Sequence, residues 1–165
     1  MNSLLPQEIQ LQATASDSIS SQYAAGFFDG EGCVELREVI SNYRYLEVRV
    51  RVRMTNTNQE VLERIKARFG GWLSRIKPPT KNSKAPWTLT IGAREVETFL
   101  RAVAPYVIVK RAQLALALGY IEFKRLTRNP GGSKSSEVLE FEQLAVSKMR
   151  ELNRRGVAAP VNGGG

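Results

Sequence analysis

The sequence predicts an α+β protein in which helices alternate with pairs of antiparallel strands. Apolar residues follow a helical period up to about Asp29 and a period of two from Cys33 onward. A second strand pair follows the next helical stretch, and the last third of the chain returns to helical periodicity. The expected order is therefore helix, strand, strand, helix, strand, strand, helix, then additional C-terminal helices, without an internal repeat.

The first helix is apolar nearly all round, and its start and end carry recognisable signals. Asp17 or Ser18 is expected to cap its N-terminus. Three consecutive small residues at 24–26 would let a neighbouring backbone approach closely. The helix is expected to end near Asp29, where the two glycines that follow can adopt positive φ.

A hairpin with one charged face is expected next. The first strand starts at Cys33, the chain turns near residues 41–42, and residues 43–54 form a long second strand. Its even-numbered apolar residues from Leu46 to Met54 face the core, and its other face carries Tyr43, Tyr45, Glu47, Arg49, Arg51 and Arg53. Arginines at alternate positions beside tyrosines favour a surface that reads phosphates and bases, and an ordinary solvated sheet face is the alternative.

The second half of the predicted fold contains another strand pair and three more helices. Asn58 is expected to cap a helix that ends at Gly70. Strands at 72–77 and 87–92 flank a basic loop, with Thr88 and Thr90 facing outward, and the period does not settle whether Ser74 or Arg75 faces out. Helices follow over about 93–103, which Pro105 stops, over 110–126, which is expected to be substantially buried, and from a cap at Ser135 or Ser136 to about residue 152.

Composition narrows the functional classes. The chain has 165 residues, a charge of +8 and a pI near 9.9, which favours a polyanionic partner such as nucleic acid. There is no histidine, which excludes histidine-assisted nucleophiles and most catalytic zinc sites, and Cys33 has no partner cysteine. Hydrolysis would rely on carboxylates, a lysine and a hard divalent cation bound through oxygen.

The ends of the chain lack signals for structure or targeting. Residues 1–16 are expected to be a flexible arm, 17–156 one domain, and 157–165 a disordered tail. No apolar run is long enough to span a membrane and no leader is evident, so a soluble, intracellular protein is expected.

The string from Ala24 to Gly32 resembles the signature of the LAGLIDADG homing endonucleases. Ala24 replaces the usual leucine, and Glu31 replaces the more common aspartate while keeping the charge. The resemblance spans roughly residues 18–126 and implies an αββαββα homing-endonuclease core with a saddle-shaped antiparallel sheet. On the residues alone, a buried helix ending in an Asp-Gly turn is the alternative.

The resemblance implies a site-specific endonuclease that makes a double-strand break in a long, near-palindromic DNA site. A single signature implies a homodimer, with an interface that includes Ala24, Ala25, Gly26 and Phe27. Catalytic roles fall to Glu31, Lys110 and Asn56, the last in place of the more common glutamine. Metal ligands would be Glu31, the Gly30 carbonyl and Asp29, although Asp29 is as well suited to fixing the turn or the dimer seam. Mg²⁺ is the expected cofactor, with Mn²⁺ as a substitute and Ca²⁺ supporting binding without efficient cleavage.

Double-stranded DNA is the expected partner, with no membrane and no small-molecule cofactor. The expected contacts come from both hairpins, with Glu35 and Glu47 as base or arginine partners: Glu35, Arg37, Tyr43, Tyr45, Glu47, Arg49, Arg51, Arg53, Arg75, Lys77, Lys81, Lys84, Thr88 and Thr90. An RNA-splicing maturase and a catalytically inactive DNA-binding regulator are the alternative functions. A maturase would need a basic surface apart from the sheet, and a regulator would usually lack the acid at Glu31.

Overall fold

The predicted order of helices and strands is confirmed. The computed structural model describes residues 18–40, 46–78, 80–81, 83–129 and 132–154. Its elements are α1 (Ser21–Glu31), β1 (Gly32–Ile40), β2 (Leu46–Asn56), α2 (Gln59–Phe69), β3 (Trp72–Arg75), β4 (Trp87–Gly92), α3 (Val96–Val103), α4 (Arg111–Leu126) and α5 (Ser136–Leu152). This is an αββαββα core followed by two further helices.

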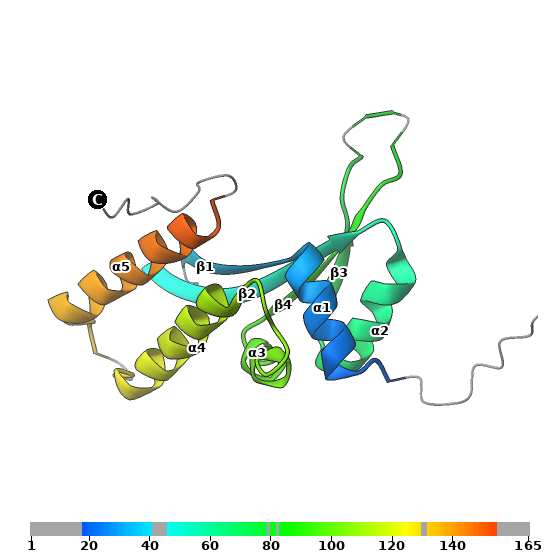
Figure 1. The fold of residues 1–165 in the computed structure, drawn as a ribbon. Helices are drawn as coiled ribbons and strands as arrows, with labels where there is room; N and C mark the ends of the chain where they lie inside the picture. Colours follow the sequence, from blue (N-terminus) through cyan, green and yellow to red (C-terminus); the bar gives the residue numbers. More distant parts are fainter. Residues whose placement is uncertain (1–17, 41–45, 79, 82, 130–131, 155–165) are drawn as a thin grey trace, which may run out of the picture.

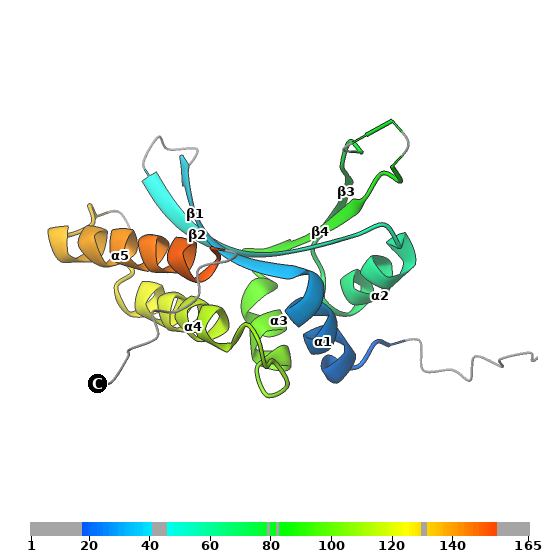
Figure 2. The ribbon, with the colours of Figure 1, turned by 45° about the horizontal axis from the view of Figure 1, so that its top comes forward.

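The four strands form one curved antiparallel sheet in the order β1-β2-β4-β3. All the helices lie on one face of this sheet (Figure 1). Figure 2 shows the opposite face as a saddle, with both hairpins rising above it. One face is thus buried by helices, and the other is left open for a ligand of large extent.

The hydrophobic core lies between the sheet and the helices. Phe99 of α3 is central to it, because the rings of Phe28 and Phe69 both pack edge-on against it, with centroids 5.7 and 5.1 Å away. Ala24 and Ala25 are fully buried in this core. Small side chains at these two positions let α1 lie deep against α3 and the sheet.

The expected N-cap of α1 was wrong, and the helix ends two residues after Asp29. Ser20 caps the helix, because its hydroxyl accepts a hydrogen bond from the Tyr23 amide (3.1 Å). The helix extends through Glu31, and the chain passes directly into β1 with Gly32 at φ −88°. Gly70 and Gly71 are the glycines with positive φ in the described part of the chain. Gly32 instead permits close approach, since a Cβ there would lie 2.3 Å from the Phe28 ring.

Other helix boundaries follow local backbone geometry. Asn58 caps α2 through the Val61 amide (3.4 Å), and Gly70 ends it at φ 79°, both as predicted. Ser135 caps α5, which is one of the two expected positions. However, α3 begins at Val96 instead of residue 93, because Ala93 has φ 41° and the chain makes a turn there.

The C-terminal helices are less buried than their apolar composition suggests. In α4, Leu126 is 78% exposed, and the buried residues of the helix are Leu114, Ala117 and Tyr120. In α5, Phe141 is partly exposed and stacks on Phe123, with the ring centroids 3.8 Å apart. A charged residue, Glu142, takes a buried position that the apolar period did not predict.

Several predictions fall outside the described residues. These are the N-terminal arm, the C-terminal tail, the turn of the first hairpin, and the side chains of Tyr43 and Tyr45. Within the described ranges, none of the helices combines the length and apolarity needed to cross a bilayer.

Candidate functional site

Glu31 occupies the last position of α1 and is exposed to solvent. The last carbonyl groups of a helix lack partners within the helix, so the backbone here also offers oxygen atoms outward. Gly30, which precedes Glu31, is exposed as well, and a Cβ built on it meets nothing within 4 Å. The end of α1 therefore presents a carboxylate beside accessible backbone.

Lys110 reaches the same helix end from a segment 80 residues away in sequence. Its ammonium group donates a hydrogen bond to the backbone carbonyl of Asp29, and its Nζ lies 5.9 Å from the centroid of the Phe28 ring. Lys110 is partly buried and immediately precedes α4. The structure thus brings together Lys110 and the signature end of α1, which places a positive charge where the dipole of α1 is negative.

Asp29 forms the connection that positions Lys110. Its carboxylate accepts hydrogen bonds from the backbone amides of Ile108 (2.7 Å), Val109 (3.2 Å) and Lys110 (3.1 Å). Partial burial by itself would raise the pKa of Asp29, but these three amides and the charge of Lys110 outweigh it and lower the pKa below its usual range. Both oxygens are engaged, so of the two roles considered for Asp29 the geometry favours fixing the turn.

Asn56 lies near the end of α1 but is engaged locally. The β1–β2 register pairs Gly32 with Met54, and β2 continues two residues further to Asn56. The Asn56 side-chain oxygen accepts a hydrogen bond from the Asn58 amide (2.8 Å), which closes the turn into α2. In this arrangement the Asn56 side-chain oxygen holds a turn.

The groups at this helix end suit a hard cation, but one chain supplies only part of a site. Within the described residues, no group of three or more acidic, cysteine or histidine side chains is placed to hold a metal ion. Mg²⁺ binds oxygen donors, keeps several waters, and is often held by one or two carboxylates together with substrate phosphates. Glu31 and the neighbouring carbonyl groups fit that pattern if DNA and a second chain provide the remaining oxygens.

The open face of the sheet carries the predicted arginines. The register places Glu35 opposite Arg51, and Arg37 opposite Arg49. We call this the arginine face. Its described members on β1 and β2 are Cys33, Glu35, Arg37, Val39, Glu47, Arg49, Arg51, Arg53 and Thr55.

Both acids on the arginine face are bonded to cations, as the sequence suggested. Glu35 accepts from Arg51 and Arg53, both at 2.5 Å. Glu47 accepts from Arg49 (2.9 Å) and Lys124 (2.6 Å). Burial alone would raise the pKa of Glu47, but the Lys124 and Arg49 partners lower it below its usual range. The face therefore stays charged but internally paired before any ligand arrives.

The second hairpin departs from the prediction at three positions. Thr88 and Thr90 share the arginine face, yet they are only 4% and 5% exposed, because β4 is an inner strand and longer neighbours cover them. Arg75 is paired with Trp87, so it belongs to the helix side of the sheet, with its guanidinium 5.9 Å from the Trp87 ring. The register also brings Trp72 to the open face, where it is 54% exposed.

Sequence reasoning missed Trp72 and Cys33 as members of the open face, and of the alternatives Ser74 and Arg75 that it left open, the register places Ser74 there. The period of two could have placed Cys33 on this face, since it lies two residues before Glu35 on the same strand. The sequence could not place Trp72 and Ser74 on this face. In a strand of four residues, alternation alone does not say which side faces the helices, and only the pairing with β4 decides it.

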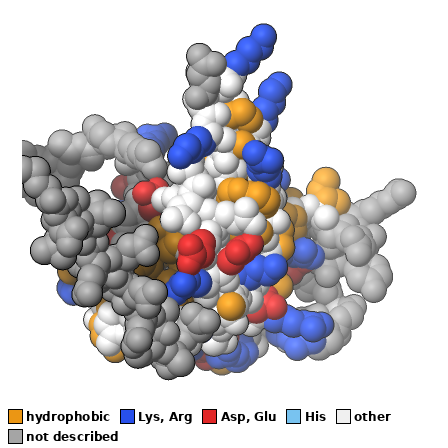
Figure 3. All heavy atoms as spheres, turned by 90° about the vertical axis from the view of Figure 1, so that its right-hand side faces the viewer, with side chains coloured by type: hydrophobic (Ala, Val, Ile, Leu, Met, Phe, Trp, Pro, Cys, Tyr) orange, Lys and Arg blue, Asp and Glu red, His pale blue; other side chains and the backbone are white. Residues whose placement is uncertain are grey.

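The tip of the second hairpin is basic and projects above the sheet. Lys77, Lys81 and Lys84 are all exposed there. In the space-filling view, blue side chains gather along this projection (Figure 3). They are placed to reach a ligand that lies on the open face.

The expected interface residues on α1 separate into two groups. Ala24 and Ala25 point into the core of their own chain and are 0% exposed. Gly26 is exposed, and Phe27 is partly exposed. An outward surface on α1 is therefore formed by Gly26 and Phe27 together with Tyr23, which is 53% exposed.

Comparison with known proteins identifies the class to which this fold and site belong. The family model described as LAGLIDADG endonuclease matches residues 24–114, more than half of the chain. The chain belongs to the LAGLIDADG endonuclease family.

Particular relatives share most of the chain. DNA endonuclease I-CvuI of Chlorella vulgaris is 28% identical over 118 residues, which is 69% of this chain and 71% of the relative. A crystal structure of I-CvuI with its target Sro1.3 in 2 mM Ca has a TM-score of 0.64 at 25% identity, covering 84% of this chain and 85% of that one. An archaeal intron-encoded homing endonuclease, I-Vdi141I, complexed with DNA has a TM-score of 0.60 at 20% identity, covering 82% and 85%.

The Asp29 contact predicts a pH-dependent loss of stability in an Asp29→Asn variant. The amide keeps the shape but loses the charge that accepts three amide hydrogen bonds, so urea unfolding at pH 7 should show a loss of about 1–2 kcal/mol. Because the folded-state pKa of Asp29 is lowered, its stabilisation is complete above the unfolded-state pKa of about 4 and is lost as pH falls through the folded-state pKa. The difference between wild type and variant should therefore shrink below about pH 4.

Glu31→Gln is the matched control, because it makes the same change at an exposed position two residues away. Its stability at pH 7 should lie within about 0.5 kcal/mol of wild type. A wild-type–Asp29→Asn difference that stays constant down to pH 3 would contradict the assigned role of the carboxylate.

Proposed function

We propose that this chain is a site-specific DNA endonuclease that acts as a homodimer, requires a divalent cation, and makes a double-strand break in a long, near-palindromic site. The observation that carries the proposal is the exposed Glu31 carboxylate at the end of α1, the same helix end to which Lys110 is bonded through the Asp29 carbonyl. Family membership supports nuclease chemistry. The arginine face supports a DNA partner, since it is basic and lies on the open side of the sheet.

The divalent cation is supported by the oxygen donors and by the relatives. I-CvuI was crystallised with the I-CreI target in 2 mM Mg, where the DNA was not cleaved, and with its own target in 2 mM Ca. A bound divalent ion supplies positive charge at the scissile phosphate and activates water for attack on phosphorus. Glu31 would hold it together with the Gly30 carbonyl. Lys110, fixed by its bond to the Asp29 carbonyl, would add positive charge beside the same phosphate.

Dimerisation is supported by an apolar surface around the end of α1. Tyr23, Gly26 and Phe27 face outward from α1. The loop that Asp29 holds adds Ile108 and Val109, which are 71% and 73% exposed. Two copies packed through this surface would bring both Glu31 side chains to the axis, one for each DNA strand. The same Asp29 carboxylate would then fix both Lys110 and part of the interface.

Glu31→Gln should abolish strand cleavage while DNA affinity stays within about tenfold of wild type, because the amide keeps the shape but not the charge that holds a cation. Cleavage of a plasmid library in Mg²⁺ and binding to the selected site are the two measurements. Asp29→Asn is the comparison that separates chemistry from folding. Magnesium-dependent cleavage that persists in Glu31→Gln would refute the assignment of Glu31. A wild-type protein that binds DNA but cleaves none of it would instead favour the inactive DNA-binding regulator.

Gly26→Leu should weaken dimerisation by at least about tenfold, since a side chain would stand where two backbones meet. A Cβ on Gly26 meets nothing within 4 Å in its own chain, so the variant should still fold. Gly119→Leu on α4 is the matched control, because its Cβ is equally unobstructed. Sedimentation equilibrium decides the question: a Gly26→Leu protein as dimeric as Gly119→Leu places the interface elsewhere.

At least one of Arg49→Ala, Arg51→Ala and Arg53→Ala should relax base preference at one symmetric pair of positions. A bidentate arginine–guanine contact contributes about 1–3 kcal/mol to discrimination, whereas a phosphate contact weakens all sequences alike. The measurement is selection of cleavable sites from a randomised library with each variant. Three variants that return the wild-type site with unchanged preferences would show that the arginine face does not read bases.

A further inference from the structure

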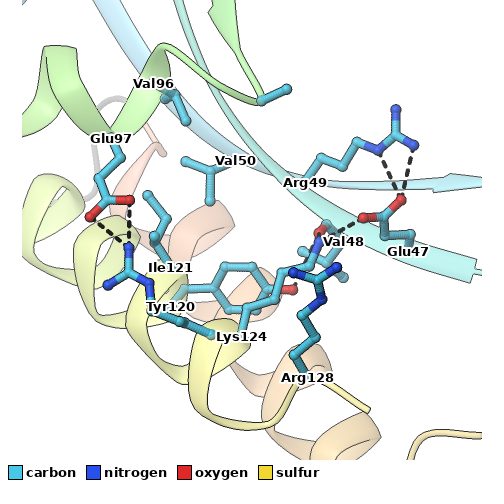
Figure 4. Close-up of a pocket in the computed structure, with 12 residues that line it drawn as sticks. Glu47, Val48, Arg49, Val50, Val96, Glu97, Tyr120, Ile121, Lys124 and Arg128 are labelled. Carbon is cyan, nitrogen blue, oxygen red and sulfur yellow. Dashed lines mark hydrogen bonds and ion pairs between the residues drawn. The ribbon is translucent and has the colours of Figure 1, made fainter. Parts of the chain in front are cut away.

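Beyond the end of β4, strand β2 has an unpaired edge that borders a cavity. The β2–β4 register stops at the Arg51–Gly92 pair, so residues 46–50 of β2 have β1 on one side and no strand on the other. A cavity of about 420 Å³ opens there between β2, α3 and α4. Its floor is apolar and includes Val50, Val96 and Ile121 (Figure 4).

One carbonyl of the unpaired edge is bonded by side chains from α4. The Val48 carbonyl accepts hydrogen bonds from the Tyr120 hydroxyl (3.3 Å) and the Lys124 ammonium (3.2 Å). The Tyr120 hydroxyl also lies 3.0 Å from Glu142. These contacts hold the back of the cavity and fix Lys124 at its mouth.

The mouth of the cavity carries more positive than negative charge. Arg49, Lys124, Arg125 and Arg128 line it, against the acids Glu47 and Glu97. Each acid is shared: Glu47 pairs with Arg49 and Lys124, and Glu97 pairs with Arg125 and Arg101. Arg128 has no recorded ion pair or hydrogen bond with any described residue, and Figure 4 shows it reaching from the end of α4 toward Lys124 and Glu47.

Like charges gathered over an apolar floor are stabilised by an anion. Lys124 and Arg128 offer several donors at this mouth, and charge-assisted hydrogen bonds from such groups to phosphate oxygens are strong. Glu47 links this group to Arg49 on the arginine face, so the basic surface continues from the open face over the edge of β2 into the cavity. A polyanion lying on the open face would pass this edge.

We propose that the mouth of this cavity is a phosphate-binding site, formed by Lys124 and Arg128 with Arg49 at its rim, that holds a backbone phosphate of the DNA outside the segment read by the sheet. The DNA as the source of the phosphate rests on the proposed function. The site would add affinity and register without reading sequence.

Arg128→Ala tests the site directly, because this exposed side chain makes no hydrogen bond or ion pair within the described part of the chain. In a Glu31→Gln background that leaves the duplex uncut, affinity for a long duplex carrying the selected site should fall about tenfold. The slope of log affinity against log salt should become shallower by about 0.9 per contact, or about 1.8 for the two protomers. Arg128→Lys should keep most of the slope, because it keeps the charge.

Two comparisons locate the contact. Lys66→Ala on α2 removes the same charge from an exposed position away from the cavity and should leave both affinity and slope near wild type. Shortening the duplex stepwise from both ends should abolish the difference between wild type and Arg128→Ala once the contacted phosphate is removed.

Inorganic phosphate distinguishes the two sources of the ligand. Perturbation of arginine side-chain NMR signals by millimolar phosphate, lost in Arg128→Ala while DNA affinity is unchanged, would assign the site to a free phosphate group. If the protein binds no DNA at all, the proposed function fails and this phosphate titration alone decides the site. An Arg128→Ala variant that matches wild type in both DNA binding and phosphate response would overturn the proposal.

Discussion

The functional region depends on one interaction: the carboxylate of Asp29 accepts hydrogen bonds from three backbone amides. Asp29 lies in the last turn of α1, and its partners are the residues that lead into α4, about 80 positions later in the chain. The anionic form is favoured because the amides and Lys110 all face it. As a result Glu31, Lys110, and the exposed pair Ile108 and Val109 are held relative to one another by a single side chain.

The arginine face shows how a basic surface is kept stable before its partner binds. Arg51 and Arg53 share Glu35, so their mutual repulsion is reduced and their side chains are held extended over the sheet. These pairs lie at the open surface of the sheet, where the arginines can exchange Glu35 for a phosphate or a guanine edge. The cost of organising long side chains is thereby reduced when DNA arrives.

Strand length determines where the sheet stops and where the helices take over. β2 extends beyond β4, and the carbonyl that β4 leaves unpaired is bonded by Tyr120 and Lys124 from α4. An unsatisfied carbonyl at that partly buried place would be costly, which explains why Tyr120 and Lys124 are directed at it. The same mismatch in strand length opens the cavity beside the basic end of α4.

The sequence by itself determined the class, the order of the helices and strands, and the chemistry available at the site. Some features depend only on composition or on residues that are neighbours in the chain, so they can be read from the sequence. They include the change from a helical period to a period of two at Cys33, the caps at Asn58 and Ser135, and the lack of histidine. Only the tertiary structure decided which face Arg75 and Trp72 occupy, that Thr88 and Thr90 are covered, and that Asp29 binds amides. These outcomes depend on which strand pairs with which and on contacts between residues 80 positions apart, and local periodicity carries no information about either.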